Sequence, residues 1–212
     1  MELSTPLLIG FFGGFFLLAV LTLTAFIKIS VVFLIVRNAI GLQQIPSNMI
    51  VMGLALFLAI FISMPVLTAS LAEMAGVGQA PESLAELLVV LQAGMLPFQG
   101  FMSRNTNPDQ MQFFLNITNK VWENSGLIGT SDMIVLQVPA FMLSELTKAF
   151  EIGFLLYLPF IAIDLAVTGI LMALGMQQVQ PSVISVPFKL LIFVYLDGWL
   201  KLVEGLLLSY ST

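Results

Sequence analysis

The sequence contains no cysteine and no histidine among its 212 residues. Without cysteine, the chain has no disulfide, thiol chemistry or iron–sulfur ligation. Without histidine, it lacks the commonest general base and the commonest metal ligand. No other metal-ligand cluster or nucleophilic constellation is present, so we expect the protein not to be an enzyme and to bind no cofactor or metal.

Charged residues are also scarce. They make up 9% of the chain, against 59% hydrophobic residues, whereas a soluble domain carries roughly 25% charged residues. A chain this apolar lacks the polar residues to cover a surface in water, so we predict an integral membrane protein or one that is buried in an assembly with lipid-like surroundings. Its seven basic residues are scattered and its formal net charge is -5, so it has no basic patch for nucleic acid.

The N-terminal stretch MELSTPLL lacks a positively charged region and a small-residue cleavage site. We therefore expect the first apolar segment to be retained rather than removed as a signal peptide. Residues 3–27 form an uncharged run longer than the roughly 20 residues that a helix needs to cross a bilayer.

The remaining apolar runs predict two long hydrophobic helical hairpins, over residues 1–72 and 139–212. Their turns are the polar segment RNAIGLQQIPSN and the segment 176–185. Residues 73–138 hold six acidic residues against two basic ones, which indicates a small helical domain outside the bilayer. The predicted fold is an all-α membrane protein in which an extracytoplasmic helical domain joins the two hairpins.

Local signals mark several helix boundaries. Ser47 or Asn48 is a candidate N-cap for the second helix of the first hairpin. Asn107 followed by proline predicts the start of a helix that runs to about residue 122. Pro65 and Pro159 are expected to kink or end their helices.

The second hairpin carries a few isolated charges. Such groups cost roughly 2.5–3.5 kcal/mol each in a bilayer by insertion scales, so they usually face a partner or a water-filled cavity. Glu145 belongs either to a short ladder with Lys148 and Glu151 along one helix face or to an ion pair with a basic residue of another helix. The obvious partner is Lys189, which we place in the first turn of the last arm, where the helix dipole disfavours a cation.

Asp164 has 12 uncharged residues before it and 24 after it. It is a candidate proton-relay group, a cap for a helix broken at Pro159, or a protonated, hydrogen-bonded carboxyl group. Lys28 is a second candidate buried ionisable residue, which either snorkels to a membrane interface or pairs with a carboxylate. Near the C-terminus, Lys201 stands four residues after Asp197 and three before a glutamate, which predicts helical ion pairs.

The tip of the second hairpin is uncharged and begins after Gly175. Met176, Gln177 and Gln178 have long unbranched side chains, and methionine fills irregular gaps readily. A ring of such loops would close a pore and still yield to a passing chain. The alternative is a plain hairpin turn.

Five stretches resemble the FliP/SctR family: VVFLIVRNAIGLQQIPSN, VPAFMLSELTKAFEIGF, LPFIAIDL, LMALGM and ISVPFKLLIFVYLDGW. These family members are export-gate subunits of bacterial type III secretion systems. The likeness covers most of both hairpins in order, and the first hairpin loop looks more like the injectisome branch. The central region resembles the family in size and character only.

The resemblance implies a homopentamer that assembles with Q/S-type and R/T-type gate subunits. The assembly would surround the channel that passes unfolded substrates across the bacterial inner membrane, with part of it on the periplasmic side. The family's methionine gasket maps onto Met176, Gln177 and Gln178, where only the first residue is methionine, so a Met/Gln ring is expected. The family's charge pair between neighbouring subunits maps onto Glu145 and Lys189.

The few positive charges near the hairpin tips place both tips on the cytoplasmic side by the positive-inside rule. The alternatives to a pore subunit are an ion- or proton-coupled multi-pass transporter that uses Asp164 and Glu145, and a scaffold that only nucleates the apparatus. The two hairpins do not repeat one another's charges, which disfavours a transporter built from repeated halves.

Overall fold

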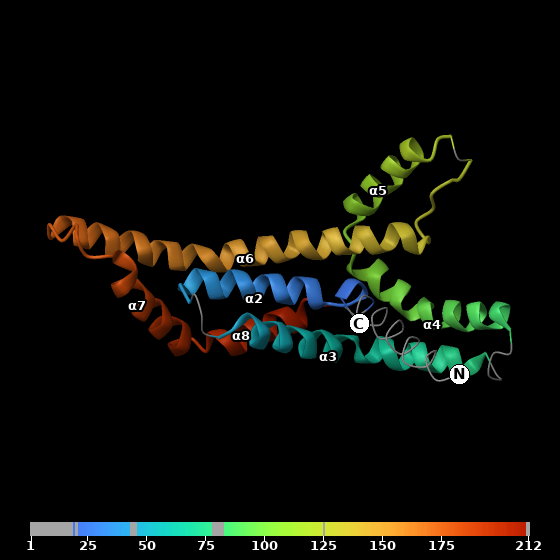
Figure 1. Cartoon of the computed structure of the whole chain (residues 1–212), viewed down its shortest axis with the longest axis horizontal. Coiled ribbons are helices and arrows are strands. Elements are labelled where there is room, and N and C mark those ends of the chain that lie inside the picture. Colours follow the sequence, from blue (N-terminus) through green and yellow to red (C-terminus); the bar gives the residue numbers. More distant parts are fainter. Residues whose placement is uncertain (1–18, 20, 43–45, 78–82, 125, 211–212) are drawn as a thin grey trace, which may run out of the picture. The chain divides into compact units, whose positions relative to one another are not determined.

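The computed structural model describes residues 19, 21–42, 46–77, 83–124 and 126–210, and these residues form helices and turns without a strand. Figure 1 shows the helices in chain order. They are α2 (Phe26–Ile40), α3 (Asn48–Gly76), α4 (Leu84–Asn105), α5 (Pro108–Val121), α6 (Ile134–Ala173), α7 (Pro181–Tyr195) and α8 (Gly198–Leu208).

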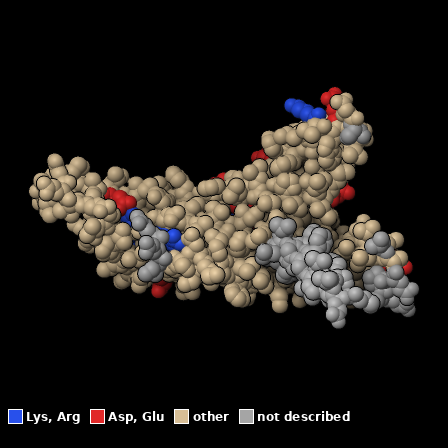
Figure 2. All heavy atoms as spheres, in the orientation of Figure 1, with Lys and Arg blue, Asp and Glu red and all other residues tan. Residues whose placement is uncertain are grey.

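Three helices among the described residues are long and apolar enough to cross a membrane: α3, residues 85–105 of α4, and α6. Helices α7 and α8 bend by 60° at a short break and form a fourth candidate if the pair is one span. Figure 2 shows a visible face made mostly of uncharged residues. The prediction of an all-α membrane protein is confirmed.

The chain divides into two compact units. Unit 1 comprises Leu58–Leu146, Tyr210 and the described part of Met1–Ile27, and unit 2 comprises Lys28–Phe57 and Thr147–Ser209. Helices α3 and α6 each contribute residues to both units. The predicted boundaries of a central domain, residues 73–138, stay a prediction.

Helix starts follow the polar signals in the sequence. The Ser47 hydroxyl accepts a hydrogen bond from the Ile50 amide at 3.4 Å, at the start of α3. The Asn107 side chain accepts from the Asp109 amide at 2.9 Å, and α5 ends at Val121. Both bonds satisfy amides that have no partner within their helix, so these two predicted helix starts are confirmed.

Pro65 and Pro159 are expected to kink or end their helices, and of these two outcomes the end is wrong. Helix α3 continues through Pro65 for 29 residues in all, and α6 continues through Pro159 for 40 residues. A full break in apolar surroundings would leave several backbone groups without hydrogen bonds, whereas a proline inside a helix removes one donor. At 1.5 Å per residue, α6 extends about 60 Å, twice the thickness of a hydrocarbon core.

The last arm also starts earlier than predicted. Helix α7 begins at Pro181, with Gln180 as its N-cap. Lys189 is therefore in the third turn of α7 and not in the first, so the predicted conflict with the helix dipole does not arise. The error came from extending the polar tip to residue 185, whereas α7 already begins at Pro181.

Aromatic contacts form the centre of each unit. In unit 1, Phe101 stacks on Tyr210 at 5.9 Å between ring centroids and meets Phe141 edge-on at 5.8 Å. In unit 2, Trp199 meets Phe33 and Phe193 edge-on, at 5.9 and 5.3 Å. These pairs hold α8 against α2 in unit 2 and Tyr210 against α4 in unit 1.

Candidate functional site

The tip between α6 and α7 is a defined turn. Two residues beyond the end of α6, Gly175 has a φ of 75°, a left-handed conformation that glycine adopts without strain. The Met176 amide donates to the Leu171 carbonyl at 2.9 Å, and the Gly175 amide donates to the Met172 carbonyl at 3.0 Å. This pair of bonds is a Schellman motif, which closes the helix end. The loop therefore starts from a fixed backbone position.

The three predicted gate residues have different environments. Met176 is 44% exposed and lines an apolar groove of about 530 Å³ between α6 and α7, with Leu171 and Phe188. Gln177 and Gln178 are exposed at the end of the hairpin. Met176 thus anchors the loop on the arms, and the two glutamines extend beyond them.

Lys189 cross-links three helices of unit 2. Its ammonium group donates to an Asp164 carboxylate oxygen on α6 at 2.5 Å and to the Ala39 carbonyl near the end of α2 at 3.0 Å. Carbonyls in the last turn of a helix have no intrahelical partner, so the second bond satisfies one of them. The lysine side chain is 5% exposed and the Asp164 side chain 45%.

The pair gives Asp164 a structural contact inside one chain. The Ser185 hydroxyl of α7 also hydrogen-bonds the Asp164 carboxylate. Asp164 lies inside the continuous helix α6, so the predicted capping of a broken helix is wrong. Sequence reasoning missed the pair with Lys189, because 25 residues and a turn separate the two groups.

Glu145 occupies the centre of unit 1 and is completely buried. The Tyr210 hydroxyl donates a hydrogen bond to its carboxylate and lies 3.4 Å from the Ala25 carbonyl oxygen. Tyr210 is beyond the end of α8, so the C-terminal end of the chain covers this glutamate. The contact was not predicted, and its only sequence signal is a tyrosine that follows an apolar helix.

Lys28 is 1% exposed and belongs to unit 2. Whether Lys28 pairs with a carboxylate stays a prediction. Within one chain, Glu145 belongs to unit 1 and Lys189 to unit 2. The predicted ion pair instead joins Glu145 of one subunit to Lys189 of a neighbouring subunit. That pairing stays a prediction, and within one chain each group has the contacts described above.

Arg37 organises the turn of the first hairpin, a role that the sequence did not reveal. Its guanidinium donates to the Leu42 carbonyl at 3.3 Å, to the Pro46 carbonyl at 3.2 Å and to the Asn48 side chain. Five donors in a rigid fork suit arginine to such multiple contacts. The turn lies against α7, where Val186 approaches Gly41 closely.

Replacing Tyr210 with phenylalanine is expected to lower the stability of the detergent-extracted protein by roughly 1.5–3 kcal/mol, the usual contribution of a hydrogen bond to a charged group. The ring contact with Phe101 would remain, so the loss reports on the hydroxyl. Thermal unfolding measures the change, with the exposed Tyr195→Phe as matched control. Equal stability of the two variants would contradict the role of this hydroxyl.

Burial, and next to it the Glu145 charge, raises the pKa of Tyr210 far above the usual value of 10.0. A group whose folded-state pKa is raised contributes stability that is fully present below the unfolded-state value and is lost as pH rises toward the folded-state one. The Tyr210 contribution is therefore constant through neutral pH and declines only above about pH 10.

Comparison with known proteins identifies the family. The FliP family model matches residues 14–206. A probable translocation protein, y4yL, of Sinorhizobium fredii is 48% identical over 199 residues, covering 93% of this chain and 90% of that protein. The Yop proteins translocation protein R of Yersinia pestis is 42% identical, covering 89% and 87%. The harpin secretion protein HrcR of Erwinia amylovora is 42% identical, covering 94% of both chains. This chain therefore belongs to the FliP family, and its relatives are type III secretion proteins of the injectisome type.

Proposed function

We propose that this protein is a pore-forming subunit of a type III secretion export gate. In this proposal it lines the channel through which unfolded substrates cross the bacterial inner membrane. The observation that carries the proposal is the exposed, uncharged tip of the α6–α7 hairpin, held by a Schellman motif in a member of a secretion family.

The mechanism is steric. Met176 packs in the groove between the arms, while Gln177 and Gln178 extend past the end of the hairpin. A ring of these loops would seal the channel with flexible side chains that carry no charge. A polypeptide in transit would displace them, and they would close again behind it. The chain needs no catalytic group for this step, because the energy comes from elsewhere in the apparatus.

The assembly proposed for the gate is a homopentamer with Q/S-type and R/T-type partner subunits. Many large apolar side chains on the faces of α3 and α6 are exposed in one chain. A single bilayer-spanning chain exposes such side chains to lipid or to other subunits. A Glu145–Lys189 pair between neighbours would fix the register of adjacent subunits. Because Glu145 is completely buried in one chain and bonded to Tyr210, this pair requires the segment around Tyr210 to move away from Glu145 on assembly.

The native mass of the detergent-extracted complex tests this assembly. We expect a mass that fits five copies of this 23.1 kDa chain together with smaller hydrophobic partner subunits. A monomer, or a homodimer without partners, would contradict the proposed gate. Deletion of the chain should also stop secretion of all substrates, whereas loss of one substrate alone would indicate an accessory role.

A further inference from the structure

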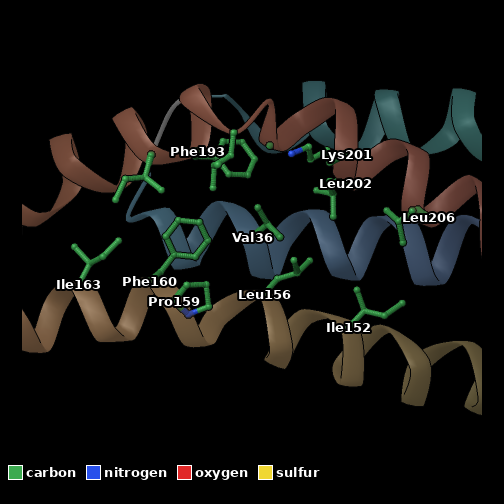
Figure 3. A pocket seen from close by; sticks show the side chains of 14 residues that line it. Val36, Ile152, Leu156, Pro159, Phe160, Ile163, Phe193, Lys201, Leu202 and Leu206 are labelled. Carbon is green, nitrogen blue, oxygen red and sulfur yellow. The ribbon is translucent and has the colours of Figure 1, made fainter.

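Unit 2 contains an apolar pocket of about 500 Å³ that the proposed gate mechanism does not use. It lies between α6 on one side and α7 and α8 on the other, with Val36 of α2 at its base (Figure 3). Helix α7 ends at Tyr195, and α8 starts at Gly198 after a 60° bend, with Asp197 at φ 52° as the N-cap of α8. Pockets of this size hold small ligands.

The lining is apolar apart from one charged side chain. Leu156, Phe160, Phe193 and Leu202 are among the residues around the pocket, and Lys201 is at its edge. The Lys201 side chain is exposed. An apolar chamber with a cation at its edge is complementary to an amphiphile with an acyl chain and an anionic head.

The ion pairs predicted for Lys201 do not form. Within the part of the chain that the structure describes, the Lys201 ammonium has no carboxylate within salt-bridge distance. Asp197 is the N-cap of α8, so it lies outside the helix that carries Lys201. Glu204 is exposed to solvent. The lysine is therefore available to an anionic group from outside the chain.

We propose that this pocket binds an acyl chain of an anionic phospholipid, with the lipid phosphate against Lys201. A membrane-embedded chain meets such lipids at high local concentration, and a lysine near a lipid surface favours anionic headgroups. The inference does not depend on the gate mechanism, since it concerns only the interior of unit 2 and a lipid.

The chain carries a built-in reporter for the test. Trp199 contacts Phe193, a pocket residue, at 5.3 Å. The other tryptophan, Trp122, caps the end of α5 in unit 1, so Trp122→Phe leaves Trp199 as the only tryptophan of this chain. Phosphatidylglycerol with a brominated acyl chain is titrated into the detergent-extracted complex of that variant, and brominated phosphatidylcholine serves as the neutral comparison.

We expect saturable quenching of Trp199, stronger with phosphatidylglycerol than with phosphatidylcholine. Lys201→Gln should weaken binding of the anionic lipid about fivefold, the effect of one lysine at a lipid surface, and leave the neutral lipid unchanged. Lys120→Gln, an exposed lysine of α5 in unit 1, should change neither lipid.

A pocket-filling variant provides the second arm. A Cβ added at Gly205 meets no atom within 4 Å, so Gly205→Leu should extend into the pocket without disturbing the backbone. We expect it to abolish saturable quenching. Gly169→Leu is the control, because Gly169 of α6 has equally open surroundings and does not line the pocket. Equal quenching in Gly205→Leu and Gly169→Leu would overturn the proposal. Absence of saturable quenching in the assembled complex would also overturn it, as expected if a neighbouring subunit fills the pocket.

Discussion

Replacing Gln177 and Gln178 together with glycine is expected to raise the ion conductance of the assembled, resting complex. The change removes the two exposed side chains at the end of the hairpin and leaves Gly175, Met176 and the Schellman hydrogen bonds intact. If the loops seal a channel by filling it, the loss of this volume leaves an open path for ions. Conductance across planar bilayers that contain the purified complex measures the effect.

A volume-matched variant separates sealing from general disturbance of the loop. Replacing Gln177 and Gln178 with methionine keeps long, unbranched, uncharged side chains at both positions. We expect this variant to conduct as little as the wild-type complex. If the glycine and methionine variants have the same conductance, whether high or low, the side chains at the tip do not form the seal.

Reversing either charge of the Asp164–Lys189 pair is expected to destabilise the protein strongly. Breaking a buried ion pair costs roughly 3–5 kcal/mol, and we expect the lower end of that range because Asp164 is 45% exposed. Asp164→Lys and Lys189→Asp should each lower the unfolding temperature and the yield of the complex. The double exchange should restore part of both, since it rebuilds the pair in the opposite sense.

The exchange of Glu145 and Lys189 tests the other predicted partner of this lysine. Glu145→Lys combined with Lys189→Glu should recover assembled complex only if these groups meet across a subunit boundary. If the Glu145–Lys189 double exchange restores the complex and the Asp164–Lys189 double exchange does not, the Asp164–Lys189 pair has no stabilising role. Recovery by the Asp164 exchange alone would leave the subunit contact without support.

Local sequence signals predicted local structure well. The caps at Ser47 and Asn107 depend on residues two or three positions away, so their hydrogen bonds follow from composition and spacing alone. The long apolar runs predicted α3 and α6, which are long and apolar enough to cross a membrane, for the same reason. Most of the first apolar run, residues 3–27, lies outside the described residues. Pro65 and Pro159 do not end their helices, because apolar surroundings favour a continuous helix over a break. The predicted kinks at these positions stay a prediction.

Partners distant in sequence were not predictable. Lys189 reaches Asp164 and the Ala39 carbonyl, 150 residues away, and Tyr210 reaches Glu145 across 65 residues. In an apolar chain, each buried charge has few polar groups available, and packing of the helices decides which one it meets. The charged positions were therefore recognisable as important, while their intrachain partners were not.

Site-specific crosslinking of a secreted protein in transit tests the central claim most directly. A photoreactive amino acid at Gln177 should crosslink to a substrate stalled in the export gate, because the proposal places this residue in the channel. The same group at Gln112, an exposed glutamine of α5, is the control, and we expect no substrate there. A substrate crosslink at Gln112 but none at Gln177, in a complex that still secretes, would show that the α6–α7 tip does not line the path of export.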